Sequence, residues 1–246
     1  MKINRTAQRT IEILELIATS DKDLTLNDIT KELQIPKTSV FDILETLVQL
    51  NMLYIKEPRL KTYAIGVKAY VIGHNYSKTS LLLNSSTSII KDLAAKTGLP
   101  VLIAKENSGN LIYTLKQEPA KKVIATPEVG DKDYLHSTSS GKAILAYSQK
   151  PLLENLPLPE VTERTITSKT NLKAELFEVR TKGYALSDRE SAEHIVSIAA
   201  PIFDYNGVAS SSLEVFALHT KDYDPNKDIA AVKKAAKQIS QLLGYA

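Results

Sequence analysis

The sequence predicts an α+β protein with two domains, a small one made of helices and a β-ribbon and a larger one built on an antiparallel sheet. Three patterns carry the prediction. Residues 25–47 have the pattern of two short helices joined by a tight turn, residues 53–65 that of a short ribbon, and residues 100–118 and 195–218 that of longer hairpins. Hairpins interspersed with helices indicate an antiparallel sheet with helices packed on it.

The clearest helical signals lie in residues 25–47. Thr25 is a preferred N-cap residue, and Asp28 can return its hydrogen bond in a capping box. Pro36 suits the first turn of the second helix, because its missing N–H costs nothing there. The apolar residues that follow have the period of an amphipathic helix; they are Val40, Ile43, Leu44 and Leu47. The outward face then holds Lys37, Thr38, Ser39, Asp42 and Thr46.

A first helix and a two-stranded ribbon flank this pair. The apolar stripe that predicts the first helix is Ala7, Ile11, Leu14 and Ala18. Residues 53–56 and 61–65 have the composition of strands around a turn that contains Pro58. Three helices followed by a ribbon are the order of a winged helix-turn-helix, in which the second helix of the pair enters the major groove. The alternative is a pair of ordinary surface helices in a helical domain.

Placement rather than bulk charge supports DNA binding. The first 75 residues hold ten Lys/Arg and nine Asp/Glu, which leaves a balance of +1. Small hydrogen-bonding residues at the start of a helix suit base edges, and cations near a ribbon turn suit phosphates. The residues expected to contact double-stranded DNA are Arg5, Thr25, Pro36, Lys37, Thr38, Ser39, Phe41, Asp42, Thr46, Lys56, Arg59 and Lys61.

Composition excludes several classes of protein. The 246 residues are 43% hydrophobic with a net charge of +3, which is typical of a packed globular protein of one or two domains. The absence of cysteine excludes disulfides, zinc fingers and thiol catalysis. Polar residues stand where a signal peptide would have its apolar core, and no apolar run reaches the ~18 residues of a membrane span. We therefore expect a cytoplasmic protein without a membrane partner.

The rest of the chain alternates helices and strands. We expect helices at 79–96, 140–147 and 171–182, the first and third closed by Gly98 and Gly183, and a last helix that opens at Asp224-Pro225. We expect strands in the two hairpins and at 121–126. The predicted domains are a winged helix-turn-helix at 1–66, a linker helix or connector at 67–83, and a second domain at 84–246.

Two polar clusters are candidates for chemistry. The segment from His136 to Lys142 opens a helix, so its free N–H groups can hold a carboxylate or phosphate, although an ordinary capped helix explains it equally well. The second cluster runs from Ser187 to His194. A hydrolase triad or a metal site could be imagined from the two clusters, but no G-x-S-x-G elbow exists and the metal ligands would need helical spacing. We expect no catalytic residue, no metal and no cofactor.

Over almost its whole length the chain resembles the IclR family of bacterial transcription regulators. The matching stretches are RTIEILELIA, LTLNDITKELQIPKTSVFDILETL, YAIG at the end of the ribbon, HSTSSGKAILA, LFEVRTKGYALSDRE and SIAAPIFDYNG. The resemblance implies a winged helix-turn-helix, a linker helix and an effector-binding domain of the GAF/profilin-like α/β type with an antiparallel sheet. It also implies a dimer or tetramer, a small organic acid or aromatic effector, and action as a repressor or activator.

The chain departs from the family pattern in both domains. Asp42 stands in the recognition helix where members commonly carry Arg, so a base contact there would favour cytosine N4. In acid-binding relatives an acidic residue and a cysteine occupy the positions of Ser187 and Ser197. A site lined by hydroxyls suggests a polyhydroxylated, sugar-derived ligand. The expected effector-binding residues are His136, Ser139, Ser140, Ser187, Asp188 and Ser197.

The sequence thus predicts a ligand-responsive, sequence-specific transcription regulator, a repressor of a catabolic operon whose effector is a small organic or sugar acid. A winged helix reads a short site, so specificity requires at least two copies. We expect a dimer or a dimer of dimers, with the N-terminal domain and residues 66–83 in the dimer interface. Two alternatives remain: a small-molecule hydrolase with a fused helical domain, and a module whose winged helix contacts protein.

Overall fold

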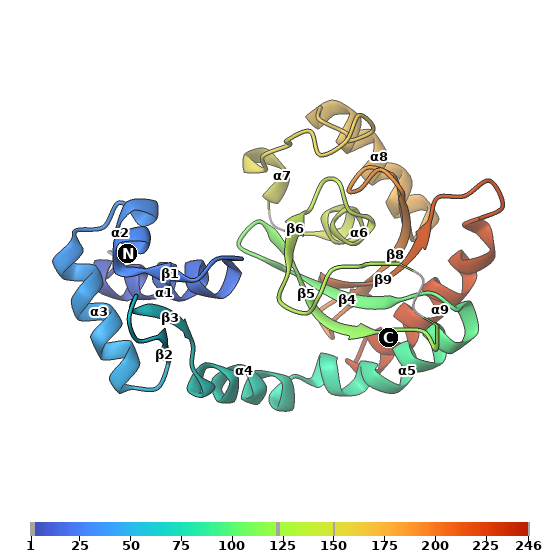
Figure 1. Cartoon of the computed structure of the whole chain (residues 1–246). Helices are drawn as coiled ribbons and strands as arrows, with labels where there is room; N and C mark the ends of the chain where they lie inside the picture. The colour runs from blue at the N-terminus through green and yellow to red at the C-terminus, as the bar shows by residue number, and fades with distance from the viewer. Residues whose placement is uncertain (1–2, 122–123, 150, 246) are drawn as a thin grey trace. The chain divides into compact units, whose positions relative to one another are not determined.

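A computed structural model describes residues 3–121, 124–149 and 151–245. The chain divides into two compact units, one up to Thr79 and one from Ser80 onward. The division falls inside the expected connector at 67–83. Each unit has its own hydrophobic core, and we describe each by itself (Figure 1).

The first unit is a winged fold of three helices and a small sheet, followed by a fourth helix. Its helices are α1 (Arg5–Thr19), α2 (Leu26–Leu33), α3 (Lys37–Gln49) and α4 (Val67–Thr79). Its strands β1 (Leu24–Thr25), β2 (Leu53–Glu57) and β3 (Thr62–Ile65) form an antiparallel sheet in the order β1-β3-β2. The predicted capping box is present, with Thr25 and Asp28 bonded reciprocally. The ribbon gains a third strand, β1, whose two residues are too few to give a sequence pattern.

The predicted face of α3 is correct and that of α1 is wrong. Val40, Ile43, Leu44 and Leu47 are all buried in the core of the first unit. In α1 the buried residues are Ile13 and Ile17, whereas Ala7, Ile11 and Ala18 are exposed. The sequence of α1 offers two apolar stripes at helical spacing, and packing against the other helices selects the stripe that contains Ile13.

The second unit is a six-stranded antiparallel sheet with helices on both faces. The strands are β4 (Val101–Asn107), β5 (Asn110–Gln117), β6 (Lys132–Tyr134), β7 (Ala185–Asp188), β8 (Ile195–Phe203) and β9 (Ala209–Leu218), in the order β6-β5-β4-β9-β8-β7. The helices are α5 (Leu81–Thr97), α6 (Ser139–Tyr147), α7 (Leu152–Asn155), α8 (Lys169–Lys182) and α9 (Asn226–Leu242). Figure 1 shows α6 on one face of the curled sheet and α5 and α9 on the other.

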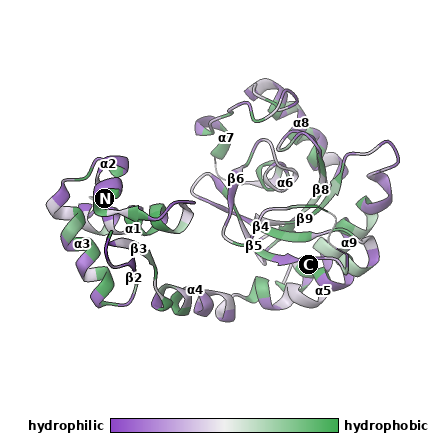
Figure 2. Cartoon of the chain, viewed as in Figure 1, coloured by the Kyte–Doolittle hydropathy of each residue, from purple (hydrophilic) through white to green (hydrophobic). Residues whose placement is uncertain are grey.

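Alternation along the strands divides the second unit into two cores. Leu102, Ala199 and Phe216 face α6, whereas Ile103 and Ala200 face α5 and α9. Figure 2 shows hydrophobic residues along the central strands β4 and β9. A sheet covered on both faces must bury both sets of side chains, which explains the nearly continuous apolar runs of β4 and β8.

Most of the predicted elements of this unit are present. Both hairpins form, and Gly98 and Gly183 end α5 and α8 in the left-handed conformation. The predicted strand at 121–126 is wrong for its described residues, which have no strand pairing, while residues 122–123 lie outside the described part of the chain. The sequence patterns missed β6 and α7, which are only three and four residues long. No helix of the described residues is long and apolar enough to span a membrane.

Candidate DNA interface and effector site

Helix α3 presents a polar face opposite its buried one. Lys37, Thr38, Asp42 and Thr46 are exposed, and Phe41 is 48% exposed on the same side. Pro36 is the N-cap residue, so the helix begins at Lys37 and the exposed Thr38 lies in its first turn. Phe41 can contact a thymine methyl group, and Thr38 can pair with a base edge. The helix therefore has the surface that a major-groove reader requires.

Three predicted DNA contacts already have partners within the protein. The Ser39 hydroxyl is half-buried and accepts a hydrogen bond from Arg9 Nη1 at 3.3 Å. The Thr46 hydroxyl donates to Asp42 O at 2.7 Å, as is common for Thr inside a helix. Thr25 Oγ1 accepts from Asp28 N in the capping box and donates to the Asp28 carboxylate at 2.5 Å. These three hydroxyls are held by hydrogen bonds within the protein, and the hydroxyl of Thr25 caps helix α2.

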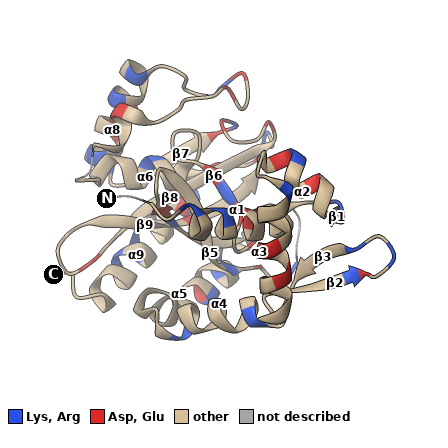
Figure 3. Cartoon of the chain, turned by 90° about the vertical axis from the view of Figure 1, so that its left-hand side faces the viewer, with Lys and Arg blue, Asp and Glu red and all other residues tan. Residues whose placement is uncertain are grey.

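The ribbon turn carries the cations that the sequence placed there (blue in Figure 3). Arg59 and Lys61 are exposed, and Lys61 has a left-handed backbone with φ 51. Lys56 instead forms an ion pair with Asp23, 2.6 Å from Nζ to Oδ1. Both of those side chains are about half exposed, so the pair contributes little stability and can open for a phosphate.

The second candidate site lies where α6 begins over the strands β7, β8 and β9. Thr138 caps α6 and uses the N–H groups of Gly141 and Lys142, which leaves those of Ser139 and Ser140 to a ligand. A Cβ on Gly141 would lie 2.2 Å from Leu135 O, so only glycine lets the preceding chain pass this close. The helix start is therefore shaped by its sequence to expose two amides in a buried place.

Serine hydroxyls from two strands meet the start of α6. Ser187 and Ser197 are direct cross-strand neighbours, and both are 1% exposed. Ser197 Oγ lies 2.9 Å from Ser139 Oγ, and Ser187 Oγ donates to Ser137 O at 2.8 Å. Ser140 is also fully buried, in the same first turn of α6. The structure thus brings together the four serines that the sequence selected.

A carboxylate that the sequence did not select lies in the same cluster. Glu214 of β9 pairs with Leu102 and Ala199 in the sheet and is 0% exposed. Its Oε1 accepts a hydrogen bond from Ser139 Oγ at 2.6 Å, and among the described residues its Oε2 has no hydrogen-bond partner. Burial raises the pKa of the Glu214 carboxyl, and the hydroxyls of Ser139, Ser140 and Ser197 oppose that rise. A lone acid within the otherwise apolar run from Leu213 to Leu218 was the signal that could have found it.

His136 borders the cluster as a neutral imidazole. It is fully buried, and its Nε2 donates to Pro159 O at 2.9 Å, because a carbonyl oxygen can only accept. Burial lowers the pKa of His136, which favours the neutral form. Its Nδ1 has no partner in the described chain and is an acceptor that a ligand or water can satisfy.

Asp188, predicted in the effector site, lies outside the serine cluster. Successive residues of a strand point to opposite faces, so Asp188 faces away when Ser187 faces α6. Its carboxylate binds Arg164 at 2.8 Å and Arg189 at 2.9 Å, and the Arg189 guanidinium lowers its pKa. The surface ion pairs of Asp188 hold the loop that follows β7.

Helix α6 also contributes to a buried ion pair. Lys142 is fully buried, with Nζ 2.6 Å from Glu190 Oε1 and 3.3 Å from Glu175 Oε1. It ties α6 to α8 and to the segment after β7. Glu190 is therefore occupied by Lys142, and no group of three His, Asp or Glu that could hold a metal occurs among the residues described.

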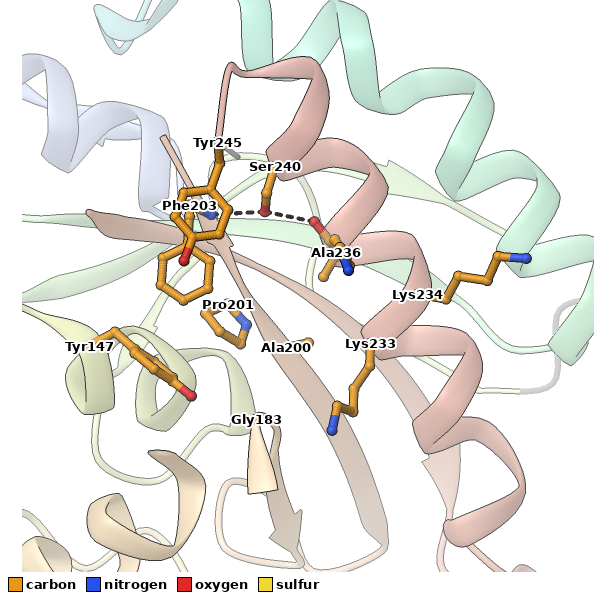
Figure 4. Close-up of a pocket in the computed structure, with 11 residues that line it drawn as sticks. Tyr147, Gly183, Ala200, Pro201, Phe203, Lys233, Lys234, Ala236, Ser240 and Tyr245 are labelled. Carbon is orange, nitrogen blue, oxygen red and sulfur yellow. Dashed lines mark hydrogen bonds between the residues drawn. The ribbon is translucent and has the colours of Figure 1, made fainter. Parts of the chain in front are cut away.

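A separate hollow of about 400 Å³ lies between α9 and the end of β8 (Figure 4). Its floor is apolar, its aromatic end is formed by Tyr147, Phe203 and Tyr245, and Lys233 lies at the other end. Ser240 Oγ accepts a hydrogen bond from the N–H of Phe203 at 3.0 Å, so α9 satisfies this backbone donor at the end of β8. None of the predicted effector residues lines this hollow.

Fold and site together define a class of protein. A winged helix with an exposed polar recognition helix is a DNA-binding unit, and here it precedes a sheet domain that holds a buried polar cluster. Residues 6–54 match the family model described as the IclR helix-turn-helix domain, and residues 74–241 match the bacterial transcriptional regulator IclR C-terminal domain.

Curated relatives and solved structures agree. The chain is 28% identical to the HTH-type transcriptional regulator BhcR of Paracoccus denitrificans, over 96% of this chain and 86% of that protein. It is 25% identical to the transcriptional repressor IclR of Escherichia coli, over 96% and 89%. The IclR regulator structure from Alicyclobacillus acidocaldarius matches with a TM-score of 0.87 at 22% identity, covering 99% and 100% of the two chains. An IclR homologue from Microbacterium hydrocarbonoxydans, complexed with 4-hydroxybenzoate, matches with a TM-score of 0.84 at 18% identity, covering 97% and 98%. The chain belongs to the IclR family and is a DNA-binding transcriptional regulator.

Proposed function

We propose that this regulator is a repressor of a catabolic operon that binds DNA through α3 and the β2–β3 turn and releases it when an effector enters the second unit. The observation that carries the DNA-binding part is the exposed polar face of α3 opposite a fully buried apolar face. The repressor sign is supported by the relative named as a repressor. The regulator acts on DNA and is therefore proposed as a cytoplasmic protein without catalytic activity.

In this proposal Thr38 and Phe41 contact base edges, whereas Arg59 and Lys61 contact phosphates. The Asp42 carboxylate can accept a hydrogen bond from the N4 amino group of a cytosine. Arg5, exposed at the start of α1, and Lys37 supply further phosphate contacts. A DNA phosphate must compete with Asp23 for the Lys56 ammonium group, so the contribution of Lys56 to DNA binding is smaller than that of Arg59.

Gel shifts on the region upstream of the regulator's own gene test these assignments. Thr38→Ala should change preference among sequences by about 1–3 kcal/mol. Arg59→Ala should weaken binding evenly and reduce the salt dependence by roughly one ion. Asp23→Asn should strengthen binding, because it frees Lys56. Lys221→Ala, the same loss of charge on an exposed residue of the second unit, is the matched control. If none of the three variants differs from that control, the winged helix contacts protein and not DNA.

We propose that the effector binds at the start of α6, against Ser139, Ser140, Ser187 and Ser197 with His136 at the border. The support is the buried polar cluster itself, in which Glu214 Oε2 and His136 Nδ1 have no partner among the described residues, because such buried atoms are rare in folded proteins. The relative bound to 4-hydroxybenzoate shows that the same fold can hold a small organic acid. Ser187→Ala should cost roughly 0.5–1.5 kcal/mol of effector affinity and leave ligand-free DNA binding unchanged.

We further propose that the regulator is a dimer or a dimer of dimers, with residues 1–66, the connector at 67–83 and the effector domain at 84–246 as its parts. Helix α4 supports this, because none of its residues is buried in the described chain while Val67, Tyr70, Val71, Ile72 and Tyr76 are each more than half exposed. Contiguous exposed apolar side chains mark interaction surfaces. Val71→Glu should shift the sedimentation coefficient toward the monomer, and Lys68→Glu on the same helix should not. A wild-type monomer at micromolar concentration would contradict the proposal.

A further inference from the structure

The start of α6 already contains a carboxylate of the protein. Glu214 Oε1 lies 2.6 Å from Ser139 Oγ, in the first turn of the helix, and Glu214 is fully buried. A helix N-terminus attracts negative charge, and at the N-terminus of α6 a carboxyl group of β9 lies in that position. The Glu214 carboxylate therefore lies within hydrogen-bond distance of a side chain in the first turn of α6, next to the place that an anionic group of an effector would take.

Charges nearby do not compensate the Glu214 carboxylate. The charged side chain that acts on Glu214 is Asp133 of β6, which is also an acid. Both carboxylates help to raise the pKa of Tyr113 on β5, after the effect of its burial. Lys142, on the same helix, is occupied by Glu190 and Glu175. The groups that favour the ionised form of Glu214 are the serine hydroxyls around it.

One of the two Glu214 oxygens still lacks a donor. Oε2 makes no hydrogen bond in the described chain, although a buried carboxylate oxygen strongly favours one. Ser212 Oγ, two residues before Glu214 on β9, and His136 Nδ1 also have no partner in the described chain. A ligand that brings hydroxyl or amino donors can satisfy these acceptors, whereas a carboxylate or phosphate brings only further acceptors.

We propose that Glu214 is the specificity-determining residue of the effector site, and that it selects a polyhydroxylated or amino-bearing ligand whose donors face it. The proposal rests on the effector site proposed above at the start of α6. The proposal narrows the range of organic and sugar acids expected from the sequence, because an acid group on the effector must then lie away from the start of α6. Short acids that consist of little more than a carboxylate are excluded from the site.

Amide NMR of the full chain, titrated with acetate at pH 7.5, tests the proposal. The reporters are the backbone amides of Ser139, Ser140 and Gly141. In the wild type these amides should not respond to acetate. In Glu214→Gln they should show a saturable shift, with an affinity at least about tenfold higher, because a like charge next to the site has been removed.

Control variants separate this effect from general loss of charge and from misfolding. Glu106→Gln neutralises another buried acid of the same sheet and should behave as the wild type. Glu214→Ala should respond to acetate as Glu214→Gln does, and dispersed amide spectra show that each variant is folded. If the Gln variant does not fold, the Ala variant decides.

The outcomes separate this proposal from the proposed function. A response in the Glu214 variants alone supports it. A wild type that binds acetate as tightly as the variants keeps the effector site and overturns the role of Glu214. Amides that stay unresponsive in every variant show that an acid does not bind at the start of α6 even without Glu214, which overturns both the role of Glu214 and an acid-binding effector site there.

Discussion

Removing Lys142 should destabilise the second unit more than most single substitutions. Lys142 is fully buried, and its ammonium group lies 2.6 Å from Glu190 and 3.3 Å from Glu175. Burial raises the pKa of the Glu190 carboxyl, and Lys142 is the main group that opposes this rise. Lys142→Met keeps the apolar stem and removes only the charge and its hydrogen bonds.

The magnitude follows from what remains behind. The Glu190 side chain is 10% exposed, so Lys142→Met leaves a buried carboxylate without its partner and should cost about 3–5 kcal/mol. Glu175 is 34% exposed and can turn to water, so it adds little. In Lys142→Met/Glu190→Leu the pair is replaced by apolar groups, which is often neutral, and most of the stability should return.

Urea unfolding of the four proteins of the double-mutant cycle measures this coupling. A raised carboxyl pKa stabilises the folded state below the unfolded pKa, and that stability is lost as pH rises through the folded pKa. The Lys142→Met deficit should therefore shrink as pH falls toward the ordinary Glu value of 4.5. A single-variant loss below about 1 kcal/mol, or a double variant as unstable as the sum of the singles, would refute the reasoning.

Three further outcomes are expected. Thr25→Ala removes the capping box with Asp28 and should lower the stability of the first unit by about 0.5–2 kcal/mol, measured by thermal unfolding; a loss equal to that of an exposed control such as Thr19→Ala would argue against the cap. Gly141→Ala forces a Cβ to 2.2 Å from Leu135 O and should cost about 3 kcal/mol, at the upper end for overpacking, with loss of the proposed effector site; a wild-type Tm would contradict the close approach. The raised pKa of Glu214 means that wild-type stability relative to Glu214→Gln should fall as pH rises from 4.5 to 8, and a flat difference in Tm would show that the folded carboxyl titrates as in water.

Local patterns determined the two helices and the ribbon of residues 25–65 and the hairpins and longer helices of the second unit. The apolar period of residues 40–47, the cap at Thr25 and the glycines after α5 and α8 act within one or two turns of the chain, so their structural consequences can be predicted from neighbouring residues. The selection of Ser139, Ser187 and Ser197 came from long stretches that resemble a family, and the structure brings their side chains together.

Tertiary structure decided the features that depend on residues distant in the sequence. Which stripe of α1 is buried depends on the helices that pack against it, and the pairing of Lys56 with Asp23 joins residues 33 apart. Glu214 meets Ser139 across 75 residues only because β9 lies beneath the start of α6. A strand pattern shows that a residue lies in a sheet, but strand order and the helix above it decide what it faces, so the contact of Glu214 with Ser139 was visible only in the folded chain.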